Sequence, residues 1–161
     1  MIRQLIATEQ SGDQGKLGKW KATVFYVSRK KCWLLTNGFT KYNVILPDIK
    51  SSDLGDIESI FKNAFFNQLV YDKIFIDYGY LDDLIGGLDF LPSDGDRSLT
   101  GFQNQRLYEL DWWKNEFVTL EDMPILDLTS RMNSSPIHIG KSYQMSDYTS
   151  SIEEMKKLLM K

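Results

Sequence analysis

Residues 20–46 carry the clearest β-type pattern of the chain, with three short apolar runs joined by two compact turns. Side chains of a strand alternate between its two faces, which places Ala22, Val24 and Tyr26 on one side of the first run. The residues between them are also largely apolar. We therefore expect these strands to be covered by other elements on both faces.

The two turns in this stretch differ in sequence. Residues 28–31, Ser-Arg-Lys-Lys, are predicted to form a four-residue turn that its charged side chains keep in water. Asn37 and Gly38 form the dipeptide that accepts positive φ at both central positions of a type I′ hairpin. The third run ends at Pro47, because proline lacks the N–H that a strand ladder needs.

Two longer segments change to a spacing of three and four residues, which is typical of an amphipathic helix. The first covers residues 53–70 and can be capped by Ser51 or Ser52. The second covers residues 98–116. The apolar positions predicted to be buried are Leu54, Ile57, Phe61, Ala64, Phe65 and Leu69 in the first segment and Leu99, Phe102, Leu107, Leu110, Trp113 and Phe117 in the second.

Several shorter elements are predicted around these helices. Residues 1–8 and 74–76 have weak strand patterns, and residues 77–96 mix glycine, proline and aspartate as loops with short helical turns do. Pro124 can open a short helix that ends at residue 131 or 132.

A final helix is predicted after a polar connector. Ser151 and Glu154 form a capping-box pattern at its start. The apolar side of this helix is formed by Ile152, Met155, Leu158 and Leu159. Helices this short are marginal alone in water, so the helix must dock on the same chain or on a neighbouring copy.

Together the elements predict an α+β fold. A small, mainly antiparallel sheet built on two hairpins is packed by the two longer helices and by short C-terminal helices. Residues 1–140 form one domain, and residues 141–161 form the polar connector and the docking helix. Docking on a neighbouring copy would make a homodimer through the C-terminal helix.

Composition and charge narrow the function classes. A chain of 161 residues with 42% hydrophobic residues buries roughly 70% of its unfolded surface, so it needs no metal or disulfide for stability. The net charge of −3 gives no whole-molecule attraction to nucleic acid or to an anionic membrane surface. No apolar run approaches a membrane span, and Cys32 alone cannot form an intramolecular disulfide, so we expect a cytoplasmic protein.

Groups for catalysis and metal binding are scarce. The one histidine, His138, lies in an extended apolar context, and no G-x-S-x-G, P-loop or G-x-G-x-x-G pattern occurs. One histidine and one cysteine exclude a zinc site built from those ligands. A calcium loop counted from Asp94 has Gln105 where a bidentate glutamate is expected, so a turn is favoured. The sequence predicts no cofactor and no metal.

Two basic positions have alternative interpretations. Residues 29–31 can contact phosphate, although a solvated turn is the simpler interpretation. Arg97 precedes the second long helix, in which Gly101 lowers helix propensity and Asn104 lies on the same face. Either something approaches the backbone at Gly101, or Arg97 pairs with an acid, Gly101 permits close packing and Asn104 caps a loop.

Three motifs together resemble a known family. They are W-x-A-x-x-F-Y-V-x-R-K-K-C-x-L-x-T-N over residues 20–37, D-R-S-L-x-G-x-x-N over residues 96–104 and S-R-M-N-x-x-P over residues 130–136. This pattern resembles an uncharacterised bacterial protein family known only as a domain of unknown function, number 6933 of that series, as far as about Gly140. The resemblance implies no activity, but it marks candidate binding residues: Trp20, Arg29, Asn37, Arg97 and Asn104.

We carry two hypotheses about function. The preferred one is a non-enzymatic binding or interaction protein of the bacterial cytoplasm, because catalytic groups are scarce and aromatic residues are abundant. The alternative is an enzyme that acts on a phosphorylated or nucleic-acid substrate through Arg29, Arg97 and Asn104, since arginine forks suit phosphate oxygens. The sequence identifies no substrate and no partner.

Overall fold

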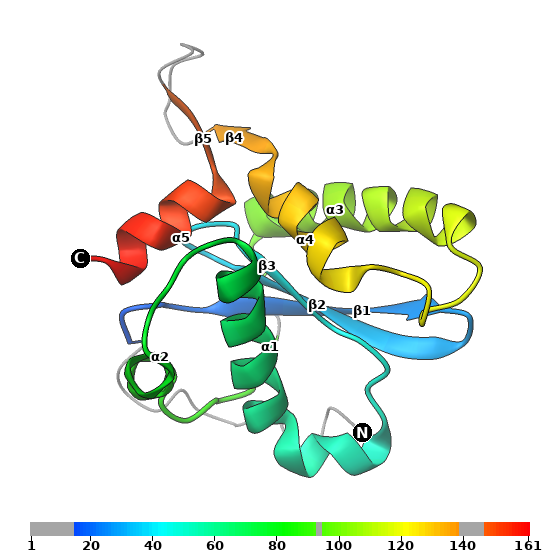
Figure 1. The fold of residues 1–161 in the computed structure, drawn as a ribbon, viewed down its shortest axis with the longest axis horizontal. Coiled ribbons are helices and arrows are strands. Elements are labelled where there is room, and N and C mark those ends of the chain that lie inside the picture. The colour runs from blue at the N-terminus through cyan, green and yellow to red at the C-terminus, as the bar shows by residue number, and fades with distance from the viewer. Residues whose placement is uncertain (1–14, 93–94, 139–146) are drawn as a thin grey trace.

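The computed structural model of the chain describes residues 15–92, 95–138 and 147–161 (Figure 1). Its centre is a three-stranded sheet in the order β1 (Trp20–Val27), β2 (Lys30–Asn37) and β3 (Asn43–Leu46). Both neighbouring pairs are antiparallel. The three predicted β-type runs and the α+β class are confirmed, and the strand predicted for residues 1–8 lies outside the described residues.

The tight hairpin turn lies at Ser28 and Arg29, and the prediction of a type I′ turn at Asn37 and Gly38 is wrong. The β1–β2 register leaves two residues between the strands. Both have positive φ, 48° and 70°, as a type I′ turn requires. The four-residue turn predicted for residues 28–31 is also wrong, because only Ser28 and Arg29 lie between the two strands. The β2–β3 connection is longer, and its positive φ of 62° is at Lys41.

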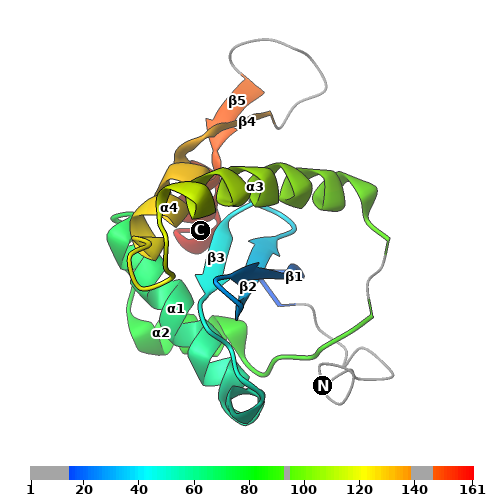
Figure 2. The same ribbon diagram turned by 90° about the vertical axis from the view of Figure 1, so that its right-hand side faces the viewer.

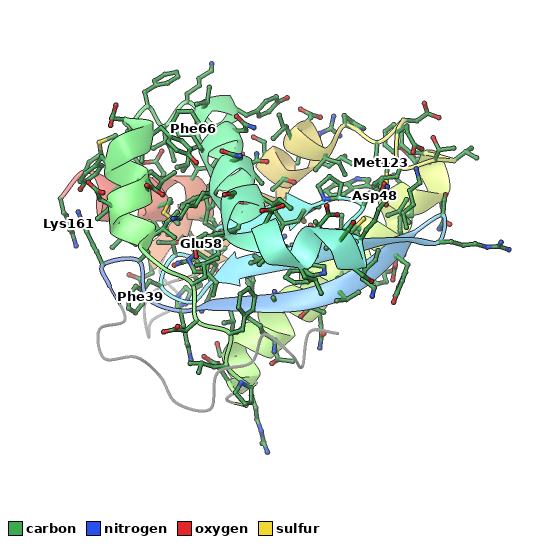
Figure 3. The ribbon with its side chains drawn as sticks, turned by 90° about the horizontal axis from the view of Figure 1, so that it is seen from below. Phe39, Asp48, Glu58, Phe66, Met123 and Lys161 are labelled. Carbon is green, nitrogen blue, oxygen red and sulfur yellow. The ribbon has the colours of Figure 1, made fainter. Side chains whose placement is uncertain are left out.

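One face of the sheet is covered by η2 (Ser51–Asp56), α1 (Ile57–Tyr71) and α2 (Tyr78–Ile85) (Figure 3). The first long helix is confirmed, although it begins as a 3₁₀ helix. Residues 74–76 form no strand, and α2 occupies part of the region predicted to be mostly loop. The buried positions of α1 that the spacing predicts are Ile57, Phe61, Phe65 and Leu69.

The other face of the sheet is covered by α3 (Arg97–Glu116) and α4 (Ile125–Ser134). Figure 2 shows the sheet between α3 on one side and α1 on the other. The side chains of β2 divide between two cores, with Trp33 and Leu35 on the α1 side and Cys32 and Leu34 on the other. The expected double coverage is therefore confirmed.

The C-terminal part adds a small sheet of β4 (Pro136–His138) and β5 (Tyr148–Ser150) and the helix α5 (Ser151–Leu159). Figure 1 shows this hairpin projecting from the body of the molecule. Met155 and Leu159 of α5 are buried in the core on the α1 side. The apolar side of α5 is thus occupied by its own chain. None of the helices in the described ranges is long and apolar enough to span a bilayer.

The cap of α5 is one residue earlier than the predicted Ser151. The Ser150 hydroxyl accepts the N–H of Glu153 at 3.2 Å. Ser151 is buried and donates its hydroxyl to the Lys41 carbonyl at 3.0 Å, which ties α5 to the β2–β3 connection.

Candidate functional site

Trp20 is a packing residue of the sheet. Its ring meets Phe61 and Phe65 of α1 edge-on, with centroid separations of 5.1 and 5.0 Å. Such aromatic contacts add to the free energy of burial. Its partner in the β1–β2 ladder is Asn37.

Asn37 is fully buried and organises the β2–β3 connection. Its amide nitrogen donates to the Leu17 carbonyl at 2.8 Å. Its amide oxygen accepts the N–H groups of Phe39 and Thr40, both at 3.0 Å, and the Thr40 hydroxyl at 3.1 Å. The side chain is fully used within the fold, because a buried amide needs such partners.

Arg29 and Arg97 lie at opposite ends of the sheet. Arg29 is in the exposed β1–β2 turn, where Ser28 donates its hydroxyl to the Val118 carbonyl beyond the end of α3. Arg97 opens α3 at the other end, next to an ion pair between Lys19 and Asp96 of 3.4 Å. The length of β1 separates the two arginines by about 25 Å. Arg29, Arg97 and Asn104 therefore do not converge on one site.

A buried polar network connects α3 to the sheet through Gln103. Its amide nitrogen donates to the Lys21 carbonyl and to the Thr36 hydroxyl, both at 3.0 Å. Its amide oxygen accepts the Thr23 hydroxyl at 2.6 Å. One side chain of α3 thus binds both β1 and β2.

The network continues across β3 to α4. The Thr36 hydroxyl donates to the Asn43 amide oxygen at 2.8 Å. The backbone and side-chain N–H groups of Asn43 both donate to the Asn133 oxygen, at 2.8 and 3.0 Å. Asn133 returns a bond to the Asn43 carbonyl at 3.1 Å. Asn133 of α4 therefore makes hydrogen bonds to the backbone of β3 that a further strand would otherwise make.

The network ends at Asp72, the C-cap of α1. The phenol of Tyr42 donates to the Asp72 carboxylate at 2.5 Å, and Asn133 lies 3.5 Å from the same oxygen. Burial, together with the Asp72 carboxylate, holds the pKa of Tyr42 far above its usual range. Tyr42 therefore stays protonated and donates its hydrogen bond at any ordinary pH.

This network has no spare group for chemistry. In the part of the chain that the structure describes, the buried side-chain polar atoms without a partner are Trp33 Nε1 and Arg106 Nε, and neither belongs to it. No group of three or more metal-binding side chains occurs within the described ranges. Every polar member is engaged by another, so the network specifies the packing of the strands and helices.

Gln103 and Arg106 are buried positions that the apolar pattern missed. The prediction placed Phe102 and Leu107 on the buried side of α3, but both are only half-buried. Arg106 is buried; its guanidinium lies 4.6 Å from the centroid of the Phe102 ring and bonds to Glu109 at 2.7 Å. The available signal was spacing, because residues 103 and 106 lie on the same face as residues 99 and 110.

The opposite side of α3 is open to solvent. We define the outer α3 face as the exposed stripe formed by Arg97, Gly101, Asn104, Tyr108 and Trp112. Tyr108 is 74% exposed and Trp112 is 59% exposed. Among the described residues, no side-chain hydrogen bond or ion pair engages Arg97 or Asn104. The fold leaves the polar and aromatic groups of this face available.

Gly101 packs against no other element among the described residues. A Cβ built at this position meets nothing within 4 Å. Glycine in a helix interior costs about 1 kcal/mol relative to alanine. The expectation that Gly101 permits close packing is therefore wrong for the described part of the fold, where this position faces open space.

A family model described as a domain of unknown function, DUF6933, matches residues 2–154. The chain belongs to this family. No curated protein and no solved structure matches the chain. The DUF6933 match continues past Gly140, where the motif resemblance ends, and includes the first four of the nine residues of α5.

The motif residues of this DUF6933 chain have two kinds of surroundings. Thr36, Asn37 and Asn133 are buried and hydrogen-bonded within the fold. Arg97 and Asn104 are exposed on the outer α3 face. The second group is the candidate binding site, because nothing in the described fold uses it.

Proposed function

We propose that this DUF6933 protein is a non-enzymatic binding protein of the bacterial cytoplasm, and that it binds another protein through the outer α3 face. The observation that carries this proposal is the exposure of Tyr108 and Trp112, at 74% and 59%. They are four residues apart and therefore neighbours on the helix surface. Large aromatic side chains contribute most of the binding energy at many protein interfaces.

The polar residues beside these aromatic side chains support the same proposal. Arg97 and Asn104 add a charge and an amide to the stripe, and arginine is enriched at interface hot spots. Binding of a partner by Arg97 and Asn104 would break no side-chain hydrogen bond or ion pair within the described fold. A cytoplasmic location agrees with a single cysteine, Cys32, that is buried and free.

The alternative, an enzyme acting on a phosphorylated or nucleic-acid substrate, requires Arg29 beside Arg97 and Asn104. The separation of about 25 Å along β1 leaves Arg29 out of reach. Arg97 and Asn104 alone supply no nucleophile and no general base. We therefore favour binding over catalysis.

Site-specific photocrosslinking in cells of the source organism tests this function. The photoreactive residue p-benzoylphenylalanine would replace Tyr108 in one strain and Phe75 in another; Phe75 is a matched control, because it is an exposed aromatic residue outside α3. We expect a discrete protein adduct from position 108 and none from position 75. Absence of an adduct at position 108, or equal adducts at both positions, would contradict the proposal.

A further inference from the structure

The outer α3 face has a symmetry in its chemistry. Arg97 and Trp112 lie near the two ends of the stripe, Gly101 and Tyr108 lie inside them, and Asn104 lies at the centre. The pairs are nearly equidistant from Asn104, at seven and eight residues and at three and four. Each pair joins unlike groups. Arg97 is a cation and Trp112 is an aromatic ring, whereas Gly101 has no side chain and Tyr108 has a large one.

Gly101 leaves open space on the outer α3 face. Its missing Cβ leaves space that no other described residue fills, since a Cβ there would meet nothing within 4 Å. The helix would be more stable with alanine at this position. A glycine is useful where another backbone or a bulky side chain must approach the helix closely.

We propose, as an extension of the proposed function on which it rests, that the partner is a second copy of this chain, bound antiparallel through the same outer α3 face. The two-fold axis passes beside Asn104. Tyr108 of each copy then occupies the space above Gly101 of the other. Arg97 of each copy lies over Trp112 of the other, where a guanidinium is attracted to the indole face.

A second copy fits this face better than an unrelated partner for a reason of symmetry. In an isologous contact both copies use the same surface. A residue that contacts a second residue of the other copy is therefore matched by the reverse contact across the axis. The stripe supplies both members of every pair. Asp111, which flanks Trp112 and bonds Lys114 at 2.8 Å, places a carboxylate where the partner copy brings Arg97. The dimer therefore brings Arg97 of each copy close to a carboxylate of the other copy.

The size of the contact predicts its strength. The helix has 20 residues and is about 30 Å long. A contact between two such helices lies below the roughly 800 Å² per partner of a standard stable interface. We therefore expect a reversible dimer that forms at micromolar concentration.

Disulfide trapping with two cysteine variants tests this arrangement. Closely packed helices are about 8–10 Å apart, so the two residues 104 in the dimer have Cα atoms about 5 Å apart, within disulfide range. Two residues 115 would be about 30 Å apart. Asn115 is a matched control, since it is exposed on the same helix. The native Cys32 is buried and does not interfere.

We expect mild oxidation to link Asn104→Cys into a dimer at least tenfold more efficiently than Asn115→Cys. Adding Gly101→Leu to Asn104→Cys should abolish the link, because leucine fills the space for Tyr108. Equal linkage of both cysteine variants, or linkage that survives Gly101→Leu, would overturn the proposed dimer.

The result also separates this inference from the proposed function. If Asn104→Cys stays monomeric and photocrosslinking at position 108 captures only other proteins, the second copy is wrong and the binding function stands. If neither experiment yields an adduct, both are overturned.

Discussion

The two sides of α3 differ in how their polar groups are used. On the inner side, Gln103 makes hydrogen bonds to both β1 and β2, and Arg106 is covered by neighbouring side chains. On the outer side, Arg97 and Asn104 are exposed and no described side chain engages them. One helix thus carries polar residues that hold the fold together and polar residues that the fold does not need.

This difference teaches how the family motifs should be interpreted. Thr36, Asn37 and Asn133 have a structural role, because these buried side chains make their hydrogen bonds within the chain. Among the described residues, no side-chain hydrogen bond or ion pair engages Arg97, and a Cβ at Gly101 would meet nothing within 4 Å. Replacing residues of each kind should therefore separate stability from binding.

The largest effect on stability is expected for Asn133→Ala. This change leaves both N–H groups of Asn43 and its carbonyl without their buried partner, which should lower the free energy of unfolding by about 3 kcal/mol. Urea denaturation measures the loss. Asn104→Ala is the exposed control and should stay within about 0.5 kcal/mol of the wild type. Similar losses in both variants would remove the distinction between the two groups.

Gln103→Ala should cost about 2 kcal/mol in the same measurement. The change removes the acceptor of the Thr23 hydroxyl and the donor to Thr36 and Lys21, all within the sheet contact. The neighbouring Gln105 is exposed, so Gln105→Ala should change stability little. A Gln103→Ala variant as stable as the wild type would show that the network does not hold α3 on the sheet.

Tyr42→Phe should lower the free energy of unfolding by about 1 kcal/mol at pH 7, because the bond to Asp72 is lost. The raised pKa of Tyr42 also predicts a pH dependence. Above about pH 10 the unfolded state loses the tyrosine proton and the folded state keeps it, so this contribution to stability falls as pH rises.

The comparison of Tyr42→Phe with the wild type should therefore change with pH. The deficit of the variant should shrink as the pH is raised from 10 to 11 in urea titrations. A deficit that is constant with pH would mean that Tyr42 ionises normally in the fold.

Gly101→Ala should give the smallest effect, a gain of about 0.5–1 kcal/mol in the free energy of unfolding of the monomer. The added Cβ meets nothing in the chain. Thermal unfolding at low protein concentration measures it. A loss of stability would indicate a contact inside the monomer that requires glycine.

Much of the fold followed from apolar spacing. The three strands, the two long helices and the double coverage of the sheet are all local patterns of period two or of three to four residues. The turn assignment failed because Ser28 and Arg29 adopt positive φ, 48° and 70°, without glycine or asparagine. The strands that they join impose this conformation, so the local sequence could not reveal it.

The candidate site was predicted less well, for a physical reason. Asn37 and Asn104 are both asparagines within the family motifs, but Asn37 is fully buried and Asn104 is exposed. Burial depends on which elements pack together, and one sequence does not contain that information. Gln103 was missed because an amide in an apolar stripe is favourable only when the sheet offers it hydrogen-bond partners.

The central claim is that the outer α3 face binds a second copy without contributing to the fold. Sedimentation equilibrium of the wild type and of Gly101→Leu, at concentrations from about 1 μM to 1 mM, tests it most directly. We predict a monomer–dimer equilibrium for the wild type and at least tenfold weaker association for Gly101→Leu, with unfolding free energy unchanged or increased. A wild type that remains monomeric throughout, or a Gly101→Leu variant that associates as strongly, would contradict the claim.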